Sequence, residues 1–143
     1  MSRYVVDANV VVKWFVPERL SERAIRLLDE TQELASPDLL WPELGNVLWK
    51  KARAGQLTRQ ETTRIVQALD QFPVTVFPSR LVLEGALEIA LGTGRSVYDS
   101  VYLALAVALD CPLVTADERL VSSLAGGPLA SHVVWLGMAG EFR

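Results

Sequence analysis

Residues 96–117 read SVYDSVYLALAVALDCPLVTAD, and they place a helix-like pattern directly before a strand-like one. The stretch 96–109 is apolar on almost every side, which predicts a deeply buried helix. The stretch 111–115 is a short apolar run, which predicts a buried strand. This order is typical of a parallel sheet, because parallel neighbours need a crossover connection and that connection is usually helical.

The same alternation of strands and helices continues through the rest of the chain. Short β-branched or apolar runs predict further strands at 4–6, 74–77 and 132–136. Helical periodicity and capping patterns predict helices at 20–28, at 42–54, from the capping box of Thr58 and Glu61 onward, at 81–91, and from Asp117 onward. We therefore predict a single α/β domain over residues 1–143, a three-layer sandwich with a mainly parallel sheet of about four strands flanked by helices.

The composition narrows the classes of protein to consider. The chain has 143 residues, of which 50% are hydrophobic, and this fits one compact domain and excludes a disordered chain. Lys and Arg total 14 against 17 Asp and Glu, which gives a formal net charge of −3. A basic protein that coats nucleic acid is thereby excluded, so any contact with nucleic acid must use a local basic patch.

The chain has one cysteine, Cys111, and one histidine, His132. These counts exclude disulfides within the chain and metal sites built from Cys and His. Any bound metal must therefore have oxygen ligands, as the hard ions Mg²⁺, Mn²⁺ and Ca²⁺ do.

We predict neither a signal peptide nor a membrane span. Asp7 interrupts the first apolar stretch, and the longest apolar run, 101–109, is far shorter than the roughly 20 residues that a bilayer requires. We therefore expect a cytoplasmic protein without a membrane partner. The single cysteine is consistent with a reducing compartment.

Two acidic residues follow predicted strands. Asp7 comes directly after 4–6, and Asp117 follows 111–115. Parallel α/β sheets bind ligands at the carboxyl ends of their strands, so both residues are candidates for a binding site. Each also precedes a plausible helix, and capping of that helix explains either residue equally well when it is considered alone.

Two further acids lie in strongly apolar sequence. Asp99 is in the most hydrophobic segment of the chain, where an unpaired carboxylate costs several kcal/mol. Ser96 and Asp99 also have the spacing of a capping box. Glu43 follows Pro42 at a predicted helix start, where an acid is favoured without any further role.

The joint occurrence of the four acids favours a metal site over four separate caps. Each is expected at a strand end or a helix N-terminus, and each has few cationic neighbours in the sequence. Carboxylates brought together repel one another unless a cation lies between them. Because no Ca²⁺ loop with alternating oxygen ligands is present, Mg²⁺ or Mn²⁺ is the expected ion.

Four segments resemble, in order, the motifs of the PIN-domain nucleases and, more narrowly, of VapC-type toxins. They are VVDANVVVKW at 5–14, PELGNVL at 42–48, SVYDSVYLALA at 96–106 and LVTADERL at 113–120. The resemblance implies a PIN-like fold and cleavage of RNA that depends on Mg²⁺ or Mn²⁺. It further implies that a cognate antitoxin protein holds the enzyme inactive and that the chain forms a homodimer.

The resemblance also implies roles for individual residues. Asn9 and Thr115 would be polar supports beside the metal, although Ser or Thr is expected at position 9 at least as often as Asn. An amide at this position can still hydrogen-bond to a metal-bound water. We expect Asp7 and Asp99 to bind the principal ion. We expect Glu43 and Asp117 to complete its shell, position the water or hold a second ion.

Basic residues near the acids are the candidates for contacts with RNA. Arg95 lies just before the helix that carries Asp99, where it would meet a phosphate or pair with that acid. A second group follows Glu43 by about two helical turns, and an ordinary solvated helix face explains it equally simply. This group consists of Lys50, Lys51 and Arg53, with Arg59 and Arg64 in the next predicted helix.

Three alternatives to a toxin ribonuclease remain open. A PIN-type nuclease of RNA maturation or decay would carry the same four acids. A phosphoacceptor domain also gathers acids around Mg²⁺, but it needs a late lysine, whereas the three lysines here all lie at or before position 51. A partner-binding module without catalysis would keep the fold and tolerate the loss of any one acid.

Overall fold

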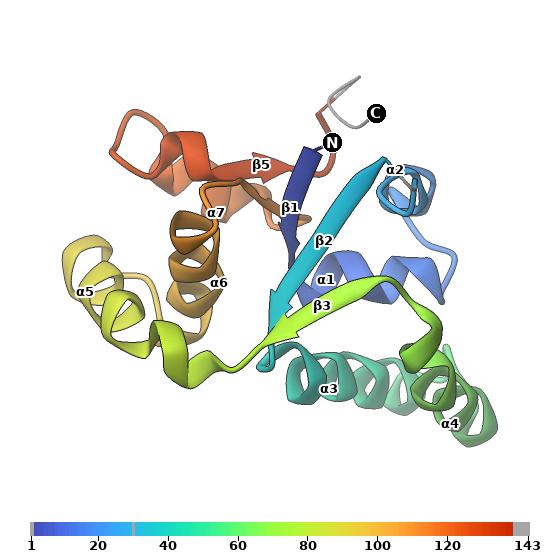
Figure 1. The fold of residues 1–143 in the computed structure, drawn as a ribbon. Helices are drawn as coiled ribbons and strands as arrows, with labels where there is room; N and C mark the ends of the chain where they lie inside the picture. The colour runs from blue at the N-terminus through green and yellow to red at the C-terminus, as the bar shows by residue number, and fades with distance from the viewer. Residues whose placement is uncertain (1, 30, 139–143) are drawn as a thin grey trace.

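The computed structural model describes residues 2–29 and 31–138, and the strands in this part of the chain form one parallel sheet (Figure 1). The strands are β1 Ser2–Val6, β2 Gln32–Pro37, β3 Val74–Phe77, β4 Leu113–Thr115 and β5 Val133–Trp135. Their order across the sheet is β3-β2-β1-β4-β5, and every neighbouring pair is parallel. The predicted α/β fold with a parallel sheet is confirmed.

Strand β2 is the one strand that the sequence pattern did not predict. Its sequence, QELASP, has no β-branched residue and no regular alternation of apolar and polar side chains, yet only Glu33 is exposed. The Ser36 hydroxyl is buried in the sheet and donates a hydrogen bond to the Val6 carbonyl at 2.9 Å. β2 lies between β1 and β3, so pairing on both edges fixes this strand where local preference does not.

Helices cover both faces of the sheet, as the predicted sandwich requires (Figure 1). Adjacent residues Val5 and Val6 of β1 point into opposite cores, because side chains alternate along a strand. The core that contains Val6 is closed by α1 Ala8–Val11, α2 Ser21–Arg26, α3 Leu40–Arg53 and α4 Arg59–Ala68. The opposite face is covered by α5 Leu83–Thr93, α6 Val97–Ala108 and α7 Glu118–Leu124.

Local signals in the sequence account for several helix boundaries. Thr58 and Glu61 form the predicted capping box, with hydrogen bonds of 3.0 and 2.8 Å, and α4 begins at the next residue after Thr58. Helix α5 ends at Thr93 and is capped by Gly94, whose φ of 77° favours glycine. Short 3₁₀ helices complete the secondary structure: η1 Val12–Trp14, η2 Leu69–Gln71, η3 Ser79–Val82 and η4 Ala130–His132.

Helix α6 is the most deeply buried helix, as predicted. Every residue from 100 to 106 is buried, and the helix packs on β1, β2 and β4 from one face. Within residues 2–29 and 31–138, no helix has both the length and the apolar character needed to cross a membrane.

The carboxyl ends of the strands bring distant parts of the chain together. β1 ends directly before Asp7, and β4 ends two residues before Asp117. The connection after β2 leads into α3, which carries Glu43, and Asp99 lies in the first turn of α6. The edge of the sheet where ligands usually bind is therefore the edge where the four predicted acids lie.

Candidate active site

One cavity at the carboxyl edge of the sheet contains all four predicted acids. Asp7, Glu43, Asp99 and Asp117 line it together with Asn9. These residues come from α3, α6 and the segments that follow β1 and β4. The structure thus brings together residues that are up to 110 positions apart, by the numbering of Asp7 and Asp117.

Asp7 is the most strongly perturbed acid of the cavity. It caps α1, and its carboxylate accepts hydrogen bonds from the backbone N–H of Asn9 at 3.5 Å and from the Thr115 hydroxyl at 3.1 Å. Burial, and then the negative charge of Glu43, raise the pKa of Asp7 from its ordinary 3.8 to about 7, although the two hydrogen bonds oppose this change. Without a cation nearby, this carboxyl group is therefore partly protonated at neutral pH.

Asn9 and Thr115 connect Asp7 to the loop that carries Asp117. The Asn9 side chain donates to the Thr115 hydroxyl at 3.2 Å and accepts from the Ala116 N–H at 3.1 Å. The Thr115 oxygen, itself fully buried, also accepts from the Asp117 N–H at 3.1 Å. Both residues lie beside Asp7, and their hydrogen bonds join α1 to the β4–α7 loop.

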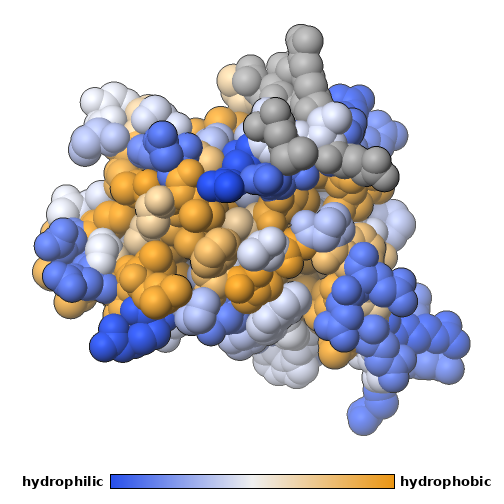
Figure 2. Space-filling view, viewed as in Figure 1, coloured by the Kyte–Doolittle hydropathy of each residue, from blue (hydrophilic) through white to orange (hydrophobic). Residues whose placement is uncertain are grey.

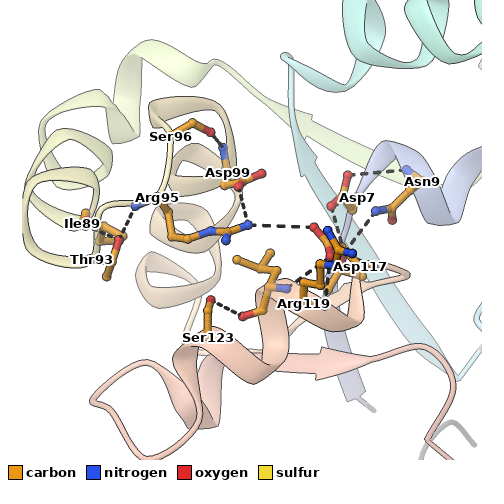
Figure 3. A network of polar contacts seen from close by, with 12 residues as sticks. Asp7, Asn9, Ile89, Thr93, Arg95, Ser96, Asp99, Asp117, Arg119 and Ser123 are labelled. Carbon is orange, nitrogen blue, oxygen red and sulfur yellow. Dashed lines mark hydrogen bonds and ion pairs between the residues drawn. The ribbon is translucent and has the colours of Figure 1, made fainter.

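Asp99 and Asp117 share a cation from the chain itself. The Arg95 guanidinium extends between them, with Nη2 at 3.0 Å from Asp99 Oδ2 and 3.9 Å from Asp117 Oδ2 (Figure 3). Asp117 also caps α7 by accepting from the N–H groups of Arg119 and Leu120. Only half of the predicted capping box of α6 forms, since Ser96 accepts from the Asp99 N–H while the Asp99 side chain contacts Arg95.

Glu43 faces the cavity with no such compensation. Its Oε1 atom is buried and has no hydrogen-bond partner within the described part of the chain. Burial raises the pKa of Glu43, the nearby charge of Asp99 raises it further, and the Tyr102 hydroxyl lowers it. Among the described residues, no Lys or Arg forms an ion pair with Glu43 or with Asp7.

The sequence matches the PIN domain family over residues 4–125. The chain belongs to the PIN-domain family. "Ribonuclease VapC3" of Pyrobaculum aerophilum is 38% identical over 120 residues, which cover 82% of this chain and 92% of that protein. "Exonuclease VapC9" of the same organism is 29% identical over 124 residues, which cover 86% of each protein.

The fold of this PIN domain is also similar to that of solved structures. The structure of VapBC2 from Rickettsia felis bound to a DNA fragment from the promoter of these proteins aligns with a TM-score of 0.63 and 14% sequence identity. The match covers 93% of this chain and 98% of that chain. The likeness supports the PIN-like fold that the sequence motifs implied.

The donor set of this PIN domain consists of oxygen atoms, as hard divalent ions require. Across residues 2–29 and 31–138, no three carboxylate, Cys or His side chains converge closely enough to hold an ion by themselves. Mg²⁺ usually keeps several waters and takes only one or two carboxylates directly. Glu43 lines the cavity without a Lys or Arg partner among the described residues, so its carboxylate is one that such a hydrated ion would balance.

The basic residues that were predicted to contact RNA differ in where they lie and in what they contact. Of the basic residues on α3, Lys50 lines the acidic cavity. Lys51 is instead bound to Glu18 at 2.5 Å, and the Arg53 guanidinium lies 5.3 Å from the centre of the Trp49 ring. Arg95 is paired with the acids, which is the second of the two expectations for this residue.

Two tyrosines at the site were missed by the sequence reasoning. Tyr98 lines the cavity with 64% of its surface exposed, and Tyr102 is buried beside Glu43. Tyr102 lies three residues after Asp99, so its helical spacing from a predicted site residue was the available signal. An apolar core position explained the residue just as well, which is why the pattern did not single it out.

Proposed function

We propose that this PIN domain is an endoribonuclease and that it acts as the toxin of a VapBC-type pair. One observation carries the proposal: four carboxylates from distant parts of the sequence line a single cavity at the carboxyl edge of the sheet. The relatives named as ribonucleases support the substrate class. We propose further that the cleavage depends on Mg²⁺ or Mn²⁺ and takes place in the cytoplasm.

The divalent ion, when bound, would supply charge stabilisation and a water that is nucleophilic at neutral pH. Asp7 and Asp99 would hold the principal ion, and Glu43 and Asp117 would complete its surroundings. Thr115 orients Asp7 by donating to Oδ2, and the Asn9 backbone N–H makes a longer contact of 3.5 Å to Oδ1. Arg95 limits repulsion between Asp99 and Asp117 and is available to a phosphate once a cation compensates these acids.

Phosphate contacts in the proposal are limited to the basic residues nearest the cavity. Lys50 lines it, and Arg95 borders two of its acids. Lys51 and Arg53 are already engaged with Glu18 and Trp49, so we assign them at most an outer role in holding RNA.

We propose an antitoxin as the protein partner, because one structural neighbour is a toxin-antitoxin complex from Klebsiella pneumoniae. Helix α3 contributes residues both to the acidic cavity and to an apolar groove between α3 and α4. The groove is lined by Leu48, Trp49, Leu57 and Val66. An antitoxin segment in this groove would lie next to the acids. The groove is therefore the surface that we assign to it.

The homodimer implied by the sequence also stays a proposal. Figure 2 shows apolar side chains gathered on the side of the molecule that carries α5 and α6. Leu81, Leu87 and Leu91 are 73%, 51% and 80% exposed there. Sedimentation of the purified chain tests the proposal, since a dimer is expected and a monomer at micromolar concentration would contradict it.

Exonucleolytic cleavage is the second candidate, because one relative is named an exonuclease. A closed circular single-stranded RNA distinguishes the two activities, since it has no end. We expect the purified chain to linearise the circle in Mn²⁺ or Mg²⁺ and to do nothing in excess chelator. Cleavage of linear RNA alone would establish the exonuclease, and inactivity on both substrates in the absence of an antitoxin would contradict the nuclease proposal.

A further inference from the structure

Tyr102 is a buried residue whose hydroxyl group the core does not need. It lies in the centre of α6 with 2% of its surface exposed, and it packs among apolar residues between the helix and the sheet. Its Oη atom is buried without a hydrogen-bond partner among the described residues. A buried polar group left in this state costs about 1–3 kcal/mol, and a phenylalanine would fill the same core without that cost.

The Tyr102 hydroxyl lies near two acids of the cavity, Asp7 and Glu43. Burial raises the pKa of Tyr102 well above its usual range, and the nearby charges of Asp7 and Glu43 raise it further, while the Ala8 backbone N–H opposes them. The hydroxyl therefore remains a proton donor. Its neighbours are carboxylates, which accept protons.

Glu43 supplies the matching acceptor. Its Oε1 is the other buried oxygen at this place without a partner in hydrogen-bonding geometry. The two groups are close enough for the Tyr102 hydroxyl to lower the pKa of Glu43, yet they do not reach the geometry of a hydrogen bond. A buried donor and a buried acceptor, both without a partner among the described residues, therefore lie near each other.

We propose that Tyr102 is a positioning residue for Glu43, and that its hydroxyl donates to this carboxylate and fixes which oxygen faces a bound divalent cation. The inference rests on the metal site described under Proposed function. Outer hydrogen-bond partners of this kind typically change metal affinity by 10–100-fold. Tyr102 thus acts through Glu43 and makes no contact with the substrate.

The test is Mn²⁺ binding to the full chain by titration calorimetry, without RNA. We expect Tyr102→Phe to raise the Kd for Mn²⁺ about tenfold. The melting temperature of the metal-free protein should be unchanged or raised. Ser100→Ala is the matched control, because Ser100 lies on the same helix and its buried hydroxyl also has no partner. This control is expected to bind Mn²⁺ as the wild type does.

A double variant shows whether Tyr102 acts through Glu43. In a Glu43→Gln background, Tyr102→Phe is expected to cause no further loss of Mn²⁺ affinity. Equal losses in both backgrounds, or an unchanged Kd for Tyr102→Phe alone, would overturn the positioning role while leaving the metal site intact. Absence of Mn²⁺ binding by the wild type would overturn the metal site and the positioning role together.

Discussion

The acidic cavity has two halves that differ in how their charge is balanced. Asp99 and Asp117 share the Arg95 guanidinium, and Asp117 also accepts two backbone N–H groups. Asp7 and Glu43 have no ion-pair partner among the described residues, and their pKa values are raised. The chain thus neutralises one half itself and supplies no Lys or Arg partner to the other half within the described residues, as the proposed metal site requires.

The largest expected effect separates the two halves by activity. Asp7→Asn removes a charge from the uncompensated half and should reduce RNA cleavage more than about 100-fold, because even an outer partner of a metal ligand is worth 10–100-fold. Asp117→Asn should cost less, since this residue retains a capping role and shares its cation. Initial rates on one RNA substrate measure both losses.

The exposed residue Glu88 of α5 offers a matched control for these neutralisations. Glu88→Gln changes the net charge by the same amount as Asp7→Asn but lies outside the cavity. Its rate should equal that of the wild type. A similar loss in Glu88→Gln and Asp7→Asn would show that total charge, rather than the site, governs the rate.

The second prediction concerns stability as a function of pH without metal. Since the folded pKa of Asp7 is raised from 3.8 to about 7, the folded state holds a proton that the unfolded state has lost between these values. The contribution of Asp7 to stability is therefore full below pH 3.8 and is lost as the pH rises through 7. The total is on the order of 4 kcal/mol, at about 1.4 kcal/mol per pH unit.

Denaturant unfolding of the wild type and Asp7→Asn, at pH 4 and at pH 8, isolates this contribution. Between pH 4 and pH 8, the wild type should lose more free energy of unfolding than Asp7→Asn does, so the variant becomes the relatively more stable protein at pH 8. A difference that is constant with pH would mean that Asp7 is an ordinary capping residue. Saturating Mn²⁺ should shift the comparison back toward the wild type, because only the wild type keeps the full set of acids.

The smallest effect on metal binding is expected for Arg95, which balances the charges of Asp99 and Asp117. Arg95→Gln removes the positive charge between Asp99 and Asp117, so Mn²⁺ affinity should rise a few-fold, about threefold, through weaker charge repulsion. Titration calorimetry measures this change. Arg80→Gln, at an exposed position of η3, is the control. Weaker Mn²⁺ binding in Arg95→Gln alone would show that Arg95 organises the acids instead of competing with the cation.

Much of the fold was predictable because it depends on local patterns. Helix α6 at 97–108 and strand β4 after it are almost continuously apolar in sequence. Such a run is what burial on all sides requires. Strand β2 was not predictable from its own residues, since Ala35 and Ser36 are buried by pairing on both sides. Tertiary pairing, rather than propensity, decides such a segment.

The site was predictable to the extent that chain topology determines it. Asp7 and Asp117 follow parallel strands, and the carboxyl ends of such strands meet at one edge. The partners of individual side chains were not predictable, because they come from contacts far apart in sequence. Lys51 is bound by Glu18, 33 positions away, and the Tyr102 hydroxyl lies beside Glu43 on another helix.

The measurement that tests the central claim most directly is RNA cleavage as a function of Mn²⁺ concentration, with wild type and Asp7→Asn compared in parallel. The account predicts a wild-type rate that rises to saturation with Mn²⁺ and falls to zero in chelator, and a variant rate that stays near the background at every concentration. Equal rates for the two proteins, or cleavage that persists in chelator, would contradict it.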